Sequence, residues 1–256
     1  MTTYKETWKL IKNNPKTALT VLGLDMLMTV CFLLIGFLFS SILNVNSFES
    51  IQNYAAGPLL VLLLVISVFY LFLVVLILSF FQMHSIKRVA LLSQKNSSIS
   101  FGSFYLANLI VSFIAIATFL VLSFVIVEVR DVFRIPLAIV LGILFFISFY
   151  ALFNIMNARV IHDKSHFEIL KNSLKQLSSF KAYAGILGFS SLVISGYLLL
   201  TYITSLILGK TVINETNIEA ANFAFTNIFY SILFIILYLL FLFNKFYFFL
   251  RVLNEK

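Results

Sequence analysis

The chain has 256 residues, of which 61% are hydrophobic and only 11% are charged, and its formal net charge is +8. A soluble domain carries about 25% charged residues, so this chain lacks the polar side chains needed to cover a surface in water. The composition therefore excludes a soluble globular protein and predicts an all-α, polytopic membrane protein. The single cysteine excludes an intramolecular disulfide and any metal site built on several cysteines.

Six apolar runs are long enough to cross a bilayer, which takes about 20 residues. They lie at 17–43, 58–83, 103–127, 136–157, 182–208 and 223–250. The first run is longer than the roughly 7–15 apolar residues of a signal peptide, so we expect it to remain as a membrane helix. The chain is therefore predicted to form a bundle of six transmembrane helices within one membrane domain, 1–256.

Basic residues gather on one side of the predicted spans. The N-terminal segment, the 2–3 and 4–5 connections and the C-terminal end hold 15 of the 18 Lys and Arg residues and four acidic residues; the other side holds three basic and five acidic residues. Because Lys and Arg accumulate in cytoplasmic loops, both termini are predicted to be cytoplasmic, in a protein of the plasma membrane. We expect the basic segments to contact anionic lipid headgroups rather than nucleic acid.

The segments that precede the first, third and fifth spans are amphipathic. "TYKETWKLIKNN", "SIKRVALLSQKN" and "SHFEILKNSLKQLSSF" each place apolar residues at helical spacing, with basic residues elsewhere. Such helices lie in the membrane interface. Because two spans follow each segment, the sequence predicts three repeats of an amphipathic helix plus a helical hairpin, at 1–84, 85–163 and 164–256. Transporters are one class of protein built from such repeats.

A carboxylate, Asp25, lies in the middle of the first apolar run, within "VLGLDMLMTV". A charged side chain inside a span is costly, so it is expected to face protein or water rather than lipid. Other polar residues are predicted to lie at a comparable depth, at one or two repeat lengths or near the ends of the returning spans. These are Ser79, Asn108, Asn154, Ser190, Asn244 and Lys245. Together with Asp25 they are predicted to form a polar layer in the cytoplasmic half of the membrane.

Three interpretations of this polar layer are open. Its side chains hold helices together through hydrogen bonds, or they line a cavity, open to the cytoplasm, that binds a polar ligand with Asp25 as the charged anchor. In the third interpretation Asp25 titrates in a proton-coupled site. Lys245 is predicted either to pair with Asp25 or to extend to the membrane interface.

The sequence carries no motif of a membrane enzyme. It has no H-E-x-x-H, G-x-S-x-G, P-loop or dinucleotide-binding glycine pattern. His162 and His166 in "HDKSH" are spaced i, i+4, but a catalytic zinc site takes a third protein ligand, so we expect no metal there. No pair of carboxylates lies in a span to act as acid and base. The chain is therefore predicted to be non-enzymatic and to have no cofactor.

The six spans, the basic amphipathic helix before each hairpin and the segment "FEILKNSLKQL" before the fifth span resemble uncharacterised prokaryotic six-span membrane proteins. These in turn resemble the membrane domain attached to some glycerophosphoryl diester phosphodiesterases. The resemblance extends over the whole chain and implies the six-span fold. No phosphodiesterase domain is present in the 256 residues, so the resemblance does not imply that activity.

Two functions are compatible with these features. The first is an integral membrane protein that binds or translocates a small or amphipathic solute, either alone or as the membrane subunit of a transporter whose ATPase docks on the amphipathic helices. The second is a structural or assembly partner of another membrane protein or lipid domain. A cavity that reaches Asp25 would favour the first, and a closed polar layer would favour the second.

Overall fold

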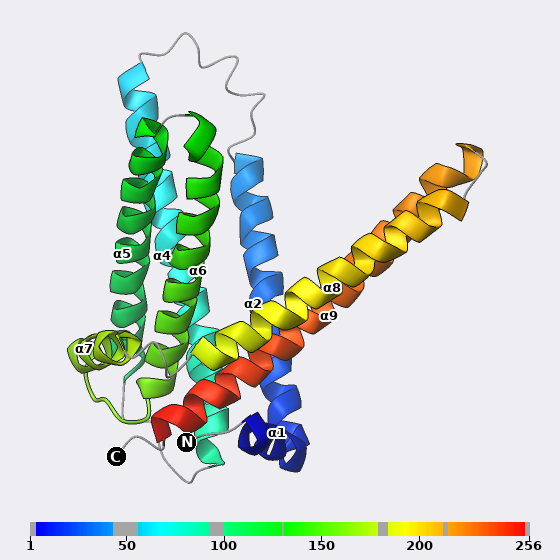
Figure 1. Ribbon diagram of the computed structural model, residues 1–256. Helices are drawn as coiled ribbons and strands as arrows, with labels where there is room; N and C mark the ends of the chain where they lie inside the picture. Colours follow the sequence, from blue (N-terminus) through cyan, green and yellow to red (C-terminus); the bar gives the residue numbers. More distant parts are fainter. Residues whose placement is uncertain are drawn as a thin grey trace.

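The computed structural model describes residues 4–42, 56–92, 100–129, 131–178, 184–211 and 215–253. Within these ranges the chain forms eight helices and no strand (Figure 1). They are α1 (Tyr4–Asn13), α2 (Pro15–Ile42), α4 (Ala56–Leu91), α5 (Phe101–Glu128), α6 (Asp131–Arg159), α7 (His166–Leu177), α8 (Ala184–Thr211) and α9 (Glu215–Leu253). All but α1 and α7 are long and apolar enough to cross a membrane. The prediction of an all-α membrane protein with six spans is therefore confirmed.

Each predicted span corresponds to one helix, but several helices extend beyond it. Helix α6 begins at Asp131 rather than at 136, and α9 begins at Glu215 rather than at 223. The reason is that hydropathy marks where a chain is apolar, whereas helical backbone bonding also extends through polar residues. Helix α6 even continues through Pro136, where the predicted span begins; the proline lies near the start of the helix, where it is tolerated. The predicted ends at 43 and 182 lie outside the described residues.

The amphipathic segment predicted before the third span is not a separate helix. It forms the last turns of α4, which continues without a break to Leu91. No glycine or proline lies between His84 and Leu91 to interrupt it. Two of the three predicted amphipathic segments, in α1 and α7, do form helices of their own.

Helices α1 and α2 are joined through a single residue, Asn14. The following Pro15 disfavours a helical conformation for Asn14, yet it is well suited to the first position of α2. The Asn14 side chain donates a hydrogen bond to the carbonyl oxygen of Leu10 at 2.9 Å, and its own carbonyl accepts one from the amide of Ala18 at 3.1 Å. These bonds cap the end of α1 and the start of α2, so the corner between them is well defined.

Helix α7 begins at a hydrogen-bonded cap. The Ser165 hydroxyl accepts a bond from the Glu168 amide at 3.3 Å, and the Glu168 carboxylate accepts one from the Lys164 amide at 2.9 Å. Ile169 on the inner face of α7 is fully buried, whereas Phe167 remains 68% exposed. The amphipathic helix is therefore present, but Phe167, one of the apolar residues of the segment "SHFEILKNSLKQLSSF", points away from the protein.

The packed interior lies at one end of the bundle, which we call the base. Helices α1 and α7 lie at the base, and α9 ends there (Figure 1). Side chains from five helices are completely buried in this interior: Val21, Phe104, Met156, Ile169 and Phe246. The base is therefore held together by contacts among all three hairpins.

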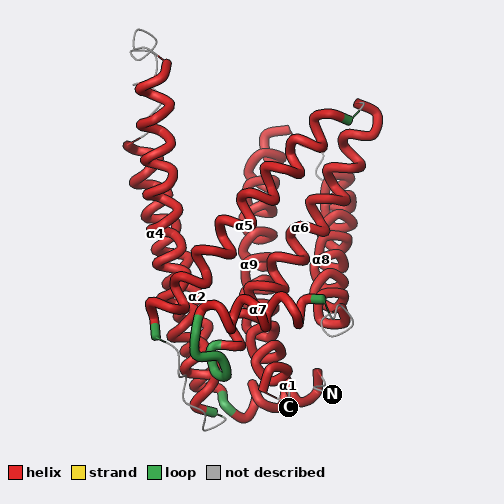
Figure 2. Tube along the Cα trace, turned by 90° about the vertical axis from the view of Figure 1, so that its left-hand side faces the viewer, coloured by secondary structure: helices red, strands yellow, loops and turns green. Residues whose placement is uncertain are grey.

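The helices spread apart towards the opposite, far end (Figures 1 and 2). The α8–α9 pair leaves the other helices at an oblique angle (Figure 1). Ring contacts beyond the base join the two partners of each hairpin, as in Phe39–Tyr70, Phe119–Phe145 and Tyr197–Phe229. One such contact, Phe72–Phe113, also joins the first hairpin to the second. Each hairpin therefore remains paired, and the first two stay in contact through α4 and α5, while the α8–α9 hairpin separates from them (Figure 1).

Candidate functional site

Asp25 of α2 and Lys245 of α9 form a buried ion pair. A helix rises about 1.5 Å per residue, so Asp25 lies about 15 Å along α2, and Lys245 lies about 12 Å before the end of α9. Their side chains are only 6% and 10% exposed. Of the two predictions for Lys245, pairing with Asp25 is the one found. The pairing lets a carboxylate lie within a span without facing lipid.

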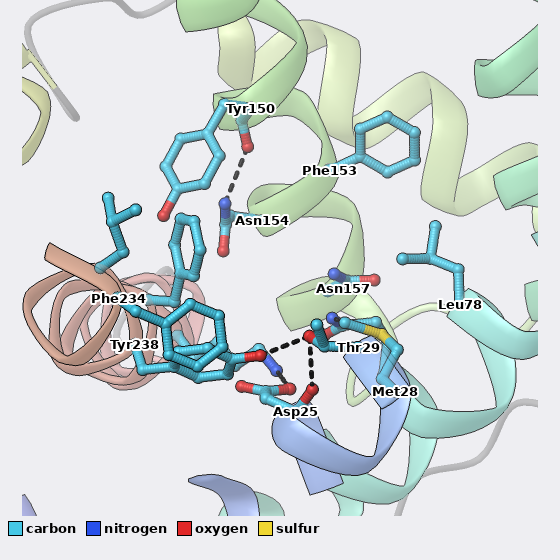
Figure 3. Close-up of a pocket in the computed structure, with 14 residues that line it drawn as sticks. Asp25, Met28, Thr29, Leu78, Tyr150, Phe153, Asn154, Asn157, Phe234 and Tyr238 are labelled. Carbon is cyan, nitrogen blue, oxygen red and sulfur yellow. Dashed lines mark hydrogen bonds and ion pairs between the residues drawn. The ribbon is translucent and has the colours of Figure 1, made fainter. Parts of the chain in front are cut away.

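A second polar contact joins the same two helices one turn further from the base. The hydroxyl groups of Thr29 and Tyr238 are hydrogen-bonded to each other. Because the Thr29 hydroxyl donates to the carbonyl oxygen of Asp25 at 3.1 Å, Tyr238 is the donor in the contact between the hydroxyls. The acid, the lysine and these two hydroxyls thus connect α2 to α9 (Figure 3).

A cavity of about 430 Å³ lies beside this connection, between α2, α4, α6 and α9. Its volume is within the usual range for small-molecule sites, about 300–1,000 Å³. Figure 3 shows side chains of all four helices around it. The lining residues are Asp25, Met28, Thr29, Leu78, Gln82, Tyr150, Phe153, Asn154, Asn157, Phe234, Leu237, Tyr238, Phe241 and Lys245.

The polar and apolar parts of this lining lie at different heights. On each of the four helices, a polar or charged residue is the lining residue closest to the base; these are Asp25, Gln82, Asn157 and Lys245. We call these four residues, with Asn154, the polar floor. Apolar side chains line the cavity further from the base, on α4, α6 and α9; they are Leu78, Phe153, Phe234, Leu237 and Phe241. The hydroxyl groups of Thr29, Tyr150 and Tyr238 line this further part as well, so the floor holds the charged and amide groups and the wall is mainly apolar.

Two oxygen atoms of the polar floor have no hydrogen-bond partner. They are Oε1 of Gln82 and Oδ1 of Asn157, on side chains that are 8% and 9% exposed. The Gln82 amide nitrogen makes only a 3.8 Å contact with the sulfur of Met28. A buried polar atom without a partner costs free energy, and such an atom in a native protein commonly bonds water or a ligand. The carboxamides of Gln82 and Asn157 line the cavity, so they are the groups of the polar floor whose hydrogen bonding the protein leaves incomplete.

The other residues predicted for the polar layer do not all reach the cavity. Asn154 lines it, and its side-chain amide donates to the carbonyl oxygen of Tyr150 at 2.8 Å (Figure 3). The Asn244 amide donates to the hydroxyl of Tyr150 at 2.7 Å and lies 3.3 Å from the hydroxyl of Ser190. Asn154 therefore belongs to the cavity itself, whereas Asn244 and Ser190 connect to it only through Tyr150.

Asn108 lies apart from the cavity. Its side-chain amide donates to the hydroxyl of Ser79 at 2.9 Å, and both residues are almost completely buried between α5 and α4. This pair has the form of interhelical hydrogen bonding expected from the first interpretation. The predicted layer thus divides into a group around the cavity and a separate pair that joins two helices.

Several residues of the site were not predicted from the sequence. Gln82, Asn157 and Thr29 each lie three or four residues from a predicted polar residue, so they share a helix face with it. This spacing of three or four residues is the sequence signal from which they could have been predicted. Tyr150 and Tyr238 had none, because a tyrosine in an apolar span is as common on a lipid-facing surface as in a site.

No metal cluster is found in the part of the chain that the structure describes: no three His, Cys, Asp or Glu side chains lie close enough to hold an ion. Asp163, between His162 and His166, instead lies 3.9 Å from Arg159 and accepts a hydrogen bond from the amide of Asn172 at 3.0 Å. It therefore joins the end of α6 to α7.

Comparison of the chain with models of known protein families, with curated proteins and with solved structures finds no match. Any functional assignment therefore depends on the geometry of the site itself.

Proposed function

We propose that this integral membrane protein binds a small amphipathic solute in the cavity between α2, α4, α6 and α9, and that it does so without catalysing a reaction. The observation that supports this most directly is the division of the cavity into a polar floor and an apolar wall. A solute with a polar head and an apolar chain matches both parts at once.

The surroundings of the cavity support the same proposal. The polar floor lies above a closely packed base, in which Val21, Met156 and Phe246 are fully buried. At the other side of the cavity, Phe234 and Phe241 are 47% and 41% exposed. The apolar wall is therefore incompletely covered by protein and is accessible to molecules dissolved in the bilayer. A pure packing contact between helices would fill this space.

In the cell we propose that the base faces the cytoplasm and that the protein resides in the plasma membrane. The excess of Lys and Arg at the base supports this orientation, as does the position of α1 and the end of α9 on the same side (Figure 1). The exposed Phe167 and Leu174 of α7, next to Lys171 and Lys175, suit contact with the interface and with anionic headgroups. A transporter ATPase or another membrane protein is the partner expected at this same face.

Photolabelling in lipid nanodiscs tests the binding proposal. Three dodecyl probes are used that share a diazirine at the end of the chain and differ in the head, which is a vicinal diol, a carboxylate or an ammonium group. At least one probe is expected to label residues 234–241 saturably. Leu237→Trp, which fills the cavity, is expected to prevent the labelling.

Leu239→Trp is the matched control, because Leu239 is 53% exposed on α9 and does not line the cavity. This variant should label like the original protein. If none of the three probes labels the cavity saturably, or if Leu237→Trp labels as well as Leu239→Trp, the proposal fails and a structural role becomes the better assignment.

A further inference from the structure

We propose, on the basis of the proposed binding function, that the ligand is an uncharged, single-chain amphiphile with a hydroxyl-bearing head, which lies between Gln82 and Asn157 while its chain follows α9. Long-chain alcohols and diols belong to this class. Three properties of the cavity support the assignment: the neutral charge of its floor, the polar atoms left without partners, and the extent of its apolar wall.

The charges of the floor neutralise each other. Asp25 and Lys245 are in direct contact, and both are buried. A ligand with a carboxylate would have to draw Lys245 away from Asp25, and a ligand with an ammonium group would have to draw Asp25 away from Lys245. Either change leaves a buried charge without its partner, which is strongly unfavourable. An uncharged head leaves the ion pair intact.

The unpartnered amide oxygens of the floor indicate which kind of uncharged head group the ligand carries. Gln82 and Asn157 reach the floor from α4 and α6, and each has a buried amide oxygen without a partner. An acceptor oxygen needs a donor, which an ester, an ether or a methyl ketone does not have. A hydroxyl group both donates and accepts, so it can bond a carboxamide in either of its two orientations. Two neighbouring hydroxyls would engage both residues.

The apolar wall accounts for the rest of the molecule. Phe234, Leu237 and Phe241 follow one another along α9 over about 10 Å. Leu78 and Phe153 face this stretch from α4 and α6. With a volume of about 430 Å³, the cavity lies in the lower half of the range for small-molecule sites. One alkyl chain is thus the apolar part that this wall suits.

A competition series tests the head group. The photolabelling of residues 234–241 is repeated with unlabelled dodecanediol, dodecanoate or dodecylammonium as competitor. The diol is expected to displace the probe at a concentration about tenfold lower than either charged competitor, because only the diol satisfies the free amides without separating the ion pair. If a charged competitor is equal to the diol or better, this inference is overturned while the binding function stands. If no probe labels the cavity, the binding function itself has failed.

Two substitutions that conserve volume test the positions of the head. In Gln82→Met and Asn157→Leu, the preference for the diol over dodecanoate is expected to fall about tenfold, while labelling by the probe persists and shows that the protein is folded. Asn108→Leu is the control, because Asn108 is equally buried but lies outside the cavity; it should keep the preference. An unchanged preference in both cavity variants would overturn the assignment of the head to these residues.

Discussion

The base and the far half of the bundle are built from the same apolar residues but are stabilised differently. Ile155 and Ile143 lie on the same helix, α6, and are 1% and 53% exposed. In the base, side chains from all three hairpins fill one interior. In the far half, residues such as Phe124 and Ile135 remain 73% and 70% exposed.

The difference follows from the solvent. Lipid tails are as apolar as leucine, so apolar side chains gain little from leaving them, and packing and polar contacts must hold the helices together. The contacts between polar side chains of different helices lie at or next to the base: Asp25–Lys245, Asn108–Ser79 and the bond between Asn244 and Tyr150. Further out, side chains bond backbone carbonyls of the neighbouring helix, as Tyr197 does with Phe229. The hairpins separate beyond these contacts, and the cavity lies where the separation begins.

Loss of the lysine of the ion pair should have the largest effect. Lys245→Met leaves Asp25 buried without its partner, and we expect the free energy of unfolding to fall by about 3–5 kcal/mol. The double variant Asp25→Leu/Lys245→Met should regain most of this loss. Unfolding in detergent micelles, followed by circular dichroism, measures both. A single variant as stable as the original protein would show that the pair does not hold α2 to α9.

Removal of the isoleucine side chains compares the two regions directly. Ile155→Ala creates a cavity in the base and should cost about 3 kcal/mol. Ile143→Ala, on the same helix, should change the free energy of unfolding by less than about 0.5 kcal/mol. The reason is that the exposed Ile143 side chain contacts lipid or detergent in both the folded and the unfolded state. Equal losses in the two variants would mean that the far half is packed against protein in the membrane.

The buried hydrogen bond between α4 and α5 should contribute less. Ser79→Ala removes the acceptor of the Asn108 amide, and interhelical hydrogen bonds in membranes are worth about 1 kcal/mol. Ser123→Ala is a matched control, because the Ser123 hydroxyl bonds only the carbonyl oxygen of Phe119 on its own helix at 2.9 Å. Thermal unfolding should distinguish the two variants; identical midpoints would argue against a stabilising role for the pair.

Substitution of Gly185 should release α1 with little effect on the rest of the protein. A Cβ atom at this position would lie 2.8 Å from the Tyr4 hydroxyl, whereas one at Gly188 would meet nothing within 4 Å. In Gly185→Leu, hydrogen exchange should become faster in α1 while the unfolding midpoint changes little. Gly188→Leu should exchange like the original protein, and similar exchange in both variants would contradict the contact.

The docking of α1 should also weaken at high pH. Partial burial and the neighbouring phenol of Tyr247 raise the pKa of Tyr4 above its ordinary value of 10.0. Docking favours the neutral phenol, so its contribution is complete below pH 10 and is lost as the pH rises through the higher pKa of the folded protein. The fluorescence of Trp8, the only tryptophan, should report this change, and Tyr4→Phe should abolish it.

Much of the fold follows from composition and periodicity, because lipid imposes long apolar helices on any chain that crosses it. The ion pair between Asp25 and Lys245 could also be predicted, since two buried charges of opposite sign at one depth have few other partners. The sequence could not show that Gln82 and Asn157 face a common cavity. Residue spacing gives the depth of a side chain and its face on the helix, but not which other helix that face meets.

The continuity of α4 is a second feature that could not be predicted from the sequence. The amphipathic segment "SIKRVALLSQKN" predicts the start of a new helix, yet its residues up to Leu91 continue the old one. A change of polarity reports a change of surroundings and does not by itself end a helix: α6 likewise begins at the charged Asp131 and runs through Pro136 into its apolar stretch.

Because of the corner at Asn14, α1 runs across the base and joins α2 to the α8–α9 hairpin. Its C-terminal end is fixed to α2 through one capped residue. Its N-terminal end is held against α8 and α9 by the rings of Tyr4, Phe189, Phe243 and Tyr247. The two helices that carry Asp25 and Lys245 are therefore joined twice, once by the ion pair and once through α1 at the base. Helices α2 and α9 therefore cannot separate at the cavity unless α1 loses its contacts with one of these two helices.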